Sequence, residues 1–103
     1  MNWNNKEKQN LIKAILALKT RDEAERFLRD LLTEGEIEEF SKRLQTAELL
    51  NQQVPYSQIE AITGFSSTTV ARVSKWLNGK NQGYKTVINK LHHHSAQTGK
   101  ELS

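Results

Sequence analysis

Apolar residues recur along the chain at spacings of three and four, which place side chains on one face of a helix. The first such stripe predicts a helix over about residues 5–19, and the last predicts a helix over residues 82–93. The sequence contains no strand-like alternation of apolar and polar residues and no internal repeat. The pattern therefore predicts an all-α protein of six helices, two of them short.

Two short motifs mark the starts of the second and third helices. Residues 20–23 and 33–36 each place a threonine three positions before a glutamate, which is the spacing of a capping box. In such a box the threonine hydroxyl accepts the glutamate amide, and the glutamate carboxylate accepts the threonine amide. Both motifs predict a helix that begins immediately after the threonine. Pro55, the only proline, predicts the end of the third helix.

Residues 56–78 fit the pattern of a helix-turn-helix. A short helix over residues 56–63 is followed by a glycine and by a second helix from about residue 67. The motif needs a small residue where the two helices meet and a turn residue that accepts positive φ. Ala61 and Gly64 meet these two needs. The residues expected to bury between the helices are Ile59, Ile62, Phe65, Val70 and Val73.

Four consecutive hydroxyl residues open the second of these helices. Such residues are poor helix formers in a helix interior but good caps and good partners for phosphates or base edges. Further along, Arg72 suits a guanine or a phosphate, whereas Lys75 and Lys80 suit phosphate. The alternative is a plain helical hairpin in which Ser66 or Ser67 serves only as an N-cap. The candidate DNA contacts are Ser57, Ser66, Ser67, Thr68, Thr69, Arg72, Lys75 and Lys80.

The distribution of charge supports an anionic partner. Residues 1–60 carry nine lysines and arginines and eleven acids, whereas residues 61–103 carry six basic side chains and one acid, Glu101. A one-signed stretch repels itself unless something anionic compensates, and double-stranded DNA is such a partner. Apolar residues make up only 36% of the chain, so a monomer would bury a thin core and a second copy would supply the missing buried surface.

The segment that carries these features resembles the Trp repressor family of six-helix, intertwined DNA-binding dimers. The resemblance covers about residues 30–77, and residues 64–77 resemble the family's turn and DNA-reading helix. The run Thr-Val-Ala-Arg-Val-Ser-Lys-Trp-Leu-Asn-Gly at residues 69–79 is closer to the Trp-repressor-like branch, whose ligand is not obviously tryptophan. The resemblance implies a transcription regulator, expected to be a repressor, that binds a palindromic operator as a homodimer.

The expected organisation is a single helical DNA-binding domain over residues 1–94. Within it, residues 1–53 form a dimerisation scaffold, residues 56–78 the helix-turn-helix and residues 82–93 a C-terminal helix. Beyond the three consecutive histidines the apolar pattern fails, so residues 95–103 are expected to be a flexible tail.

The resemblance also implies a place for an effector. Thr33, Arg43 and Arg72 match positions around the family's tryptophan pocket, whereas Val73 and Trp76 depart from it. Val73 stands where the family has a small residue, and Trp76 stands where it has a serine that meets the ligand's amino group. Both changes add bulk to a space that holds an indole, so we expect free tryptophan not to bind. A sharper hypothesis is that Trp76 itself fills this space.

Other classes of function find less support in the sequence. His92, His93 and His94 point in different directions on a helix, so at most two could share a metal ion, and we expect no metal and no cofactor. The chain has no cysteine, no phosphate-cradling loop and no paired carboxylates in a catalytic setting, so we expect no enzyme. Its N-terminus lacks a signal-peptide core and no apolar run approaches a membrane span, so we expect a cytoplasmic protein. The alternatives are a helical dimeric protein-interaction module and a transposase-type DNA-recognition domain.

Overall fold

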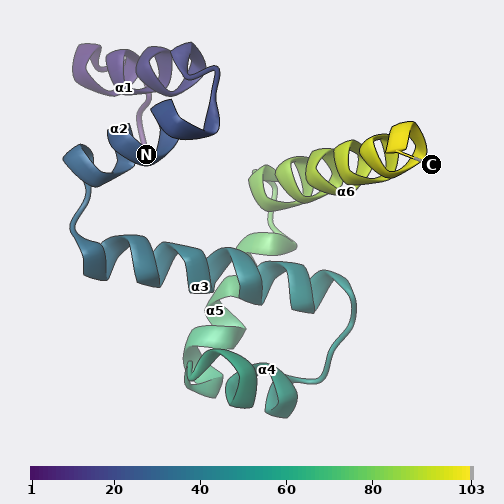
Figure 1. Cartoon of the computed structure of the whole chain (residues 1–103). Helices are drawn as coiled ribbons and strands as arrows, with labels where there is room; N and C mark the ends of the chain where they lie inside the picture. Colours follow the sequence, from purple (N-terminus) through teal and green to yellow (C-terminus); the bar gives the residue numbers. More distant parts are fainter. Residues whose placement is uncertain (103) are drawn as a thin grey trace. The chain divides into compact units, whose positions relative to one another are not determined.

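The computed structural model describes the backbone of residues 1–102 and the side chains of residues 1–93. Over these residues the chain forms helices and no strand (Figure 1), which confirms the predicted all-α class. The helices are α1 (Lys6–Ala17), α2 (Arg21–Leu31), α3 (Glu34–Asn51), α4 (Tyr56–Thr63), α5 (Ser67–Leu77) and α6 (Gly83–Leu102).

The chain divides into two compact units, Met1–Glu38 and Glu39–Ser103. The boundary lies inside α3, whereas the sequence analysis placed the end of a dimerisation scaffold at residue 53. A single domain over residues 1–94 stays a prediction. We refer below to the first and the second unit.

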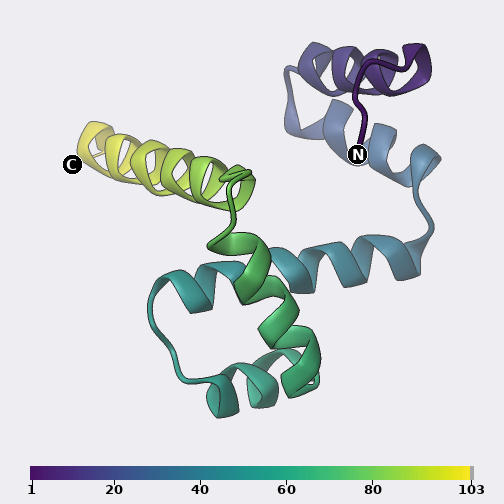
Figure 2. The same cartoon turned by 180° about the vertical axis from the view of Figure 1, so that it is seen from behind.

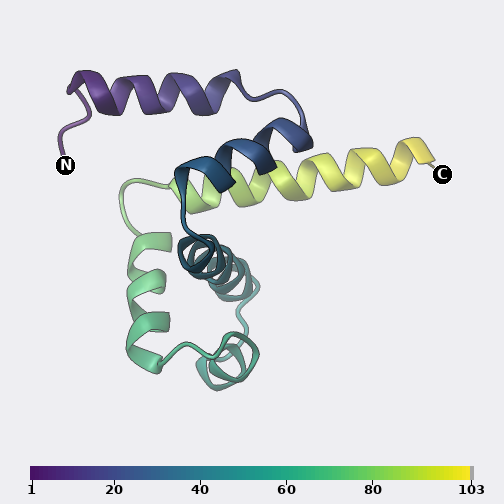
Figure 3. The same ribbon diagram turned by 60° about the vertical axis from the view of Figure 1, so that its left-hand side comes forward.

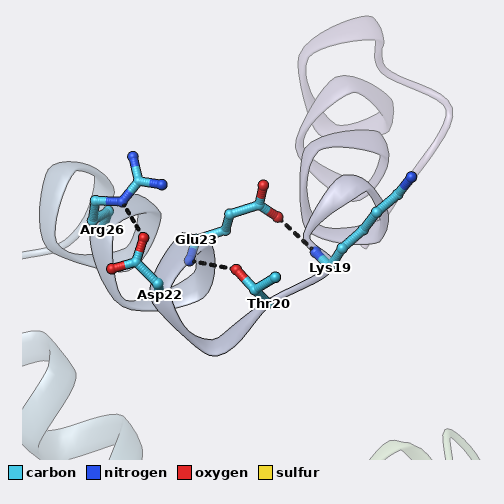
Figure 4. A network of polar contacts seen from close by, with 5 residues as sticks. All are labelled: Lys19, Thr20, Asp22, Glu23 and Arg26. Atoms are coloured by element: carbon cyan, nitrogen blue, oxygen red, sulfur yellow. Dashed lines mark hydrogen bonds and ion pairs between the residues drawn. The ribbon is translucent and has the colours of Figure 1, made fainter.

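The first unit is built from local interactions. Asn5 caps α1 by accepting the Lys8 amide at 2.9 Å, and the Thr20 hydroxyl caps α2 by accepting the Glu23 amide at 3.1 Å. The Glu23 carboxylate accepts the amide of Lys19 at 2.9 Å, as Figure 4 shows. The predicted capping box is therefore wrong in one bond: the carboxylate bonds the amide one residue before the threonine. The backbone at the N-cap is extended, with φ −129° and ψ 159°, and in this arrangement the earlier amide lies within reach.

The capping box at the start of α3 forms in full. The Thr33 hydroxyl accepts the Glu36 amide at 3.1 Å, and the Glu36 carboxylate accepts the Thr33 amide at 2.9 Å. Hydrogen bonding of the Glu36 carboxylate to the Thr33 backbone amide, and to a smaller extent to the Thr33 side chain, lowers the pKa of Glu36 below its usual value of 4.5. The sequence therefore predicted the start of α3 correctly from two residues.

Neither α1 nor α2 contains a buried side chain. Several of their apolar residues are strongly exposed, with Leu16 at 77% and Leu31 at 49%. Exposed i,i+4 ion pairs, such as Arg26 with Asp22 at 2.8 Å, add little stability on their own (Figure 4). Helices this short are marginal in water without an apolar partner surface. Much of the apolar surface of α1 and α2 is therefore exposed.

The second unit holds the apolar core. Ala47 of α3, Val73 and Leu77 of α5, and Ile88 of α6 are buried against one another. Burying large apolar side chains is the main term that stabilises a fold, at roughly 25 cal/mol for each Å² removed from water. Thr46, also buried, satisfies its hydroxyl by donating to the Lys42 carbonyl at 2.7 Å. Figure 3 shows α5 and α6 meeting at a steep angle, so that both can pack on this core.

The last helix is longer than predicted. It was expected to end at residue 93, but α6 runs to Leu102, through most of the segment 95–103 expected to be a flexible tail. The segment contains no proline, and Ala96, Gln97, Lys100 and Glu101 are good helix formers, so the backbone ladder continues without an apolar stripe. The side chains from His94 onward lie outside the described residues.

Candidate nucleic-acid interface and the groove beside it

A sharp turn joins α4 to α5. Pro55 is the N-cap of α4, and Gly64 ends the helix with φ 77° and an amide that donates to the Glu60 carbonyl at 2.8 Å. A Cβ at Gly64 would meet no atom within 4 Å, so the backbone angle, rather than space, requires glycine there. Figure 2 shows the steep crossing of α4 and α5 that the turn produces. The turn residue and the helix bounds agree with the sequence prediction.

The contact between α4 and α5 uses fewer residues than predicted. Ile59, Thr63 and Val70 are buried in it, and the Thr63 hydroxyl donates to the Ile59 carbonyl at 2.8 Å. Ala61 is exposed, and so is Ile62, at 55%; the prediction that they face inward is wrong. On so short a helix the i,i+4 pair Ile59 and Thr63 defines the buried face, so Ala61 and Ile62 point away from it.

The first turn of α5 is capped by its own hydroxyls. Ser66 Oγ accepts the Thr69 amide at 3.2 Å and lies 3.1 Å from the Thr69 hydroxyl. Ser67 and Thr68 are exposed, and within the described residues their hydroxyls make no hydrogen bond. The four hydroxyl residues therefore divide into a capping pair and a pair that faces solvent.

One face of α5 points away from the core and carries only small or basic side chains. Thr68, Ala71, Arg72 and Lys75 follow one another at i, i+3, i+4 and i+7, and all four are exposed. Their opposite face carries the buried Val70, Val73 and Leu77. We call the four exposed residues the α5 outer face. Ala71 was not singled out from the sequence, although its position between Thr68 and Lys75 at helical spacing could have indicated it.

Other predicted contacts lie off this face. Ser57 is exposed on α4, two residues after its N-cap, and Lys80 is exposed beyond the end of α5. No acidic side chain occurs between residues 61 and 100, so α5 and most of α6 present one sign of charge. A surface of this composition attracts anionic partners such as phosphate and repels basic ones.

A groove of about 960 Å³ lies beside the last turn of α5, within the second unit. It brings together Arg43, Lys75, Trp76 and Lys80, all of which the sequence analysis named. The loop after α5 and the start of α6 form the other walls of the groove. The sequence did not indicate this, because the residue pattern of one helix does not show how that helix packs against another. The additional lining residues are Leu44, Gly79, Asn81, Gly83, Tyr84 and Val87.

Arg43 is held between aromatic rings. Its guanidinium carbon lies 5.4 Å from the centre of the Phe40 ring and 5.6 Å from the centre of the Trp76 ring. Its Nη2 lies 2.8 Å from the Glu39 carboxylate. Both rings are within the distance at which a cation is attracted to the face of an aromatic ring. Nearby, burial raises the pKa of the Tyr84 hydroxyl above 10.0, against a smaller lowering by Arg43.

Two of the five residues named for an effector pocket line the groove of the second unit. Arg43 and Trp76 meet in the groove, but Val73 is fully buried in the apolar core and Arg72 lies on the α5 outer face. Thr33 lies in the first unit, where it caps α3. Helical geometry explains why Val73 lies apart from Arg72, because adjacent residues of a helix point about 100° away from each other. Arg72 and Trp76, four residues apart, lie one turn from each other on the same side of α5. Trp76 is 43% exposed, so it lines the groove rather than being enclosed by protein.

No group of three or more histidines, cysteines or acids within the described side chains could hold a metal ion. His92 and His93 are exposed on α6, and the side chain of His94 lies outside the described range. In the part of the chain that was searched, no helix is long and apolar enough to cross a membrane.

Known proteins resemble this chain over most of its length. The family model described as Trp repressor protein matches residues 6–92. The uncharacterized protein YerC of Bacillus subtilis is 37% identical over 86 residues, which cover 84% of this chain and 83% of YerC.

Two solved structures share the fold. A TrpR-like protein from Eubacterium eligens superposes with a TM-score of 0.83 at 37% identity, covering 87% of this chain and 93% of that one. A candidate Trp repressor from Staphylococcus aureus superposes with a TM-score of 0.82 at 33% identity, covering 89% and 95% of the two chains. The likeness therefore extends well beyond the helix-turn-helix.

Proposed function

This chain belongs to the Trp repressor protein family, a family of DNA-binding regulators rather than enzymes, and on that premise we propose a more specific role. We propose that it binds a palindromic site in double-stranded DNA as a homodimer and represses transcription there. The helix α5 enters the major groove and is called the recognition helix from here on. The observation that carries the proposal is the α5 outer face, which is exposed, free of acids and directly follows the Gly64 turn.

The chemistry of the outer face suits a DNA groove. Thr68 and Ala71 are short enough to allow close approach and offer a hydroxyl and a methyl group to base edges. Arg72 can bond two guanine acceptors at once, and Lys75 can meet a phosphate. Ser57 on α4 and Lys80 after α5 are placed to hold the backbone on either side, where contacts position the protein without reading sequence.

Dimerisation is proposed from the uncovered apolar side chains of the first unit. Leu11, Ile15 and Leu16 of α1 are between 37% and 77% exposed. Apolar side chains gathered on one helix at this exposure mark an interaction surface. A second copy of the chain would cover them and would also present two recognition helices, as a palindromic site requires.

We propose further that L-tryptophan is not the corepressor. Val73 uses its side chain in the core, so that position offers no space for an indole. Arg43, a position of the family's ligand pocket, already faces the rings of Phe40 and Trp76. Addition of L-tryptophan should leave the affinity for DNA unchanged.

Binding to DNA at several salt concentrations tests the proposal. A random-sequence duplex should bind at low salt, and the affinity should fall steeply as salt rises because counterions are released from phosphates. Selection from a random library should then yield a palindrome. A helical protein-interaction module, the rival class, would show no DNA binding even at low salt.

Arg72→Ala tests the recognition helix on the selected duplex. If Arg72 reads a base, the variant should lose about 1–3 kcal/mol of specific binding and should discriminate less at one base pair. Arg26→Ala, which removes an exposed arginine of the first unit, is the matched control and should bind as the unsubstituted protein does. Equal weakening on all duplexes would instead assign Arg72 to a phosphate contact. Gel-shift or fluorescence-anisotropy titration measures both outcomes.

A further inference from the structure

We propose that Arg43 and Trp76 act as positioning residues whose stack holds the recognition helix on α3. The proposal rests on the proposed DNA-binding function and deepens it. The Arg43–Trp76 stack consists of the Arg43 guanidinium with the rings of Phe40 and Trp76 on it, 5.4 Å and 5.6 Å away.

The stack joins α3 and α5, whose relative position matters for the proposed DNA binding. Arg43 and Phe40 belong to α3, which carries part of the apolar core, and Trp76 belongs to the last turn of α5. Trp76 directly follows Lys75 and comes one turn after Arg72, both on the α5 outer face. A shift of Trp76 therefore moves the two basic side chains proposed to meet DNA.

The core beneath α5 is made of aliphatic side chains. Val73 and Leu77 pack there on Ala47 and Ile88, which are aliphatic contacts with no directional preference. A guanidinium over an indole face has a preferred geometry, because the ring attracts a cation only over its face. The stack therefore restrains the orientation of α5 relative to α3, in addition to the close packing that the core provides.

Arg43 is itself restrained before it meets the tryptophan. The Glu39 carboxylate lies 2.8 Å from Arg43 Nη2 one turn earlier on α3, and Phe40 offers a second ring on the same helix. The Arg43 side chain is 36% exposed, so the guanidinium is partly removed from water, and its attraction to the rings is less weakened by solvent. Two contacts, with Glu39 and Phe40, therefore restrain the Arg43 side chain, and Trp76 makes the third.

The test uses the duplex selected with the unsubstituted protein. Trp76→Ala and Arg43→Ala should each weaken specific binding about threefold to tenfold, the range expected for one cation–π contact. The double variant should be no weaker than either single variant, because each substitution removes the same interaction. Trp76→Phe should restore most of the affinity, since it keeps an aromatic face. Circular dichroism should show unchanged helix content in all variants.

Salt dependence separates positioning from direct contact. Neither Trp76→Ala nor Arg43→Ala should change the slope of log affinity against log salt concentration, because neither removes a phosphate contact. Lys75→Ala, which alters the residue next to Trp76, is the control and should reduce that slope by about 1. A reduced slope for Arg43→Ala would overturn the proposal by making Arg43 a phosphate ligand, and so would additive losses in the double variant.

A fluorescence measurement reports the stack without DNA. In a Trp3→Phe background, Trp76 is the only tryptophan. Adding Arg43→Ala should shift the emission of Trp76 to the red and increase its quenching by acrylamide. Unchanged emission and quenching would contradict the proposal that Arg43 stacks on Trp76 in solution. Failure of the unsubstituted protein to bind any duplex would overturn the proposed function as well, whereas normal binding by both alanine variants would overturn the role of the stack alone.

Discussion

The two units of this chain use opposite means to form helices. In the first, the helices α1 and α2 are capped by side chains and carry exposed ion pairs, yet they bury no residue. In the second, residues from α3, α5 and α6 are buried together around Ala47 and Ile88. Local interactions contribute a few tenths to about one kcal/mol each, whereas a buried aliphatic side chain contributes more. The second unit is therefore stabilised by a buried core, whereas α1 and α2 depend on caps and ion pairs within the first unit.

The largest expected effect comes from the core of the second unit. Ile88→Ala removes a fully buried side chain and should lower the free energy of unfolding by about 2–5 kcal/mol, because a cavity is left behind. Ile62→Ala makes the same chemical change where the side chain is 55% exposed, and it should cost less than about 1 kcal/mol. Urea unfolding followed by circular dichroism measures both. Equal losses would mean that Ile62 is covered in solution.

A smaller effect is expected from the exposed apolar face of the first unit. Leu16→Glu places a charge where a second copy is proposed to pack, and it should raise the dimer dissociation constant about tenfold to a hundredfold. Lys13→Glu changes charge on the same helix without removing an apolar side chain and is the matched control. Sedimentation equilibrium measures the association. If Leu16→Glu left it unaltered, α1 would have no part in the dimer.

The smallest effect concerns acid and the start of α3. Because hydrogen bonds from Thr33 lower the pKa of Glu36, the contribution of this carboxylate to stability is fully present above pH 4.5 and is lost as the pH falls through the lowered pKa. The difference in melting temperature between the unsubstituted protein and Glu36→Gln should therefore shrink in that acid range.

Thr33→Ala sharpens this measurement. It removes the hydroxyl but keeps the backbone amide, which is the larger cause of the shift, so the pKa of Glu36 should stay below 4.5. A carboxyl titration followed by NMR reports the value directly. A return to the usual value in Thr33→Ala would mean that the hydroxyl, rather than the amide, holds the carboxylate.

Sequence reasoning succeeded where a short motif determines the structure. Thr33 with Glu36, and Gly64 after a short helix, specified helix ends that the structure reproduces, because caps and positive φ depend on a few neighbouring residues. Sequence reasoning failed to assign which side of α4, a helix of eight residues, is buried. Ile62 is apolar and suitably spaced, yet Ile59 and Thr63 occupy the contact with α5. Hydrophobic spacing alone leaves the buried side of so short a helix ambiguous.

The candidate site divides in the same way. The outer face of α5 followed from spacing, since Thr68, Arg72 and Lys75 recur at helical intervals on a helix whose start was known. The groove did not, because Tyr84 and Val87 reach it from a helix whose direction is set by the packing of Ile88. Family resemblance grouped Val73 with Arg43 and Trp76, and the structure separates it from them by burying it in the core.

By itself the sequence determined that six helices form, where α2 and α3 begin, the turn at Gly64 and the one-signed charge that follows it, all of which depend on residues near one another in the chain. The tertiary structure decided which apolar side chains are buried, such as Ile88, and which are exposed, such as Leu16. It also decided that Arg43 meets Trp76, thirty-three positions further along the chain. Such contacts depend on where whole helices lie in space, which side-chain periodicity along one helix does not specify.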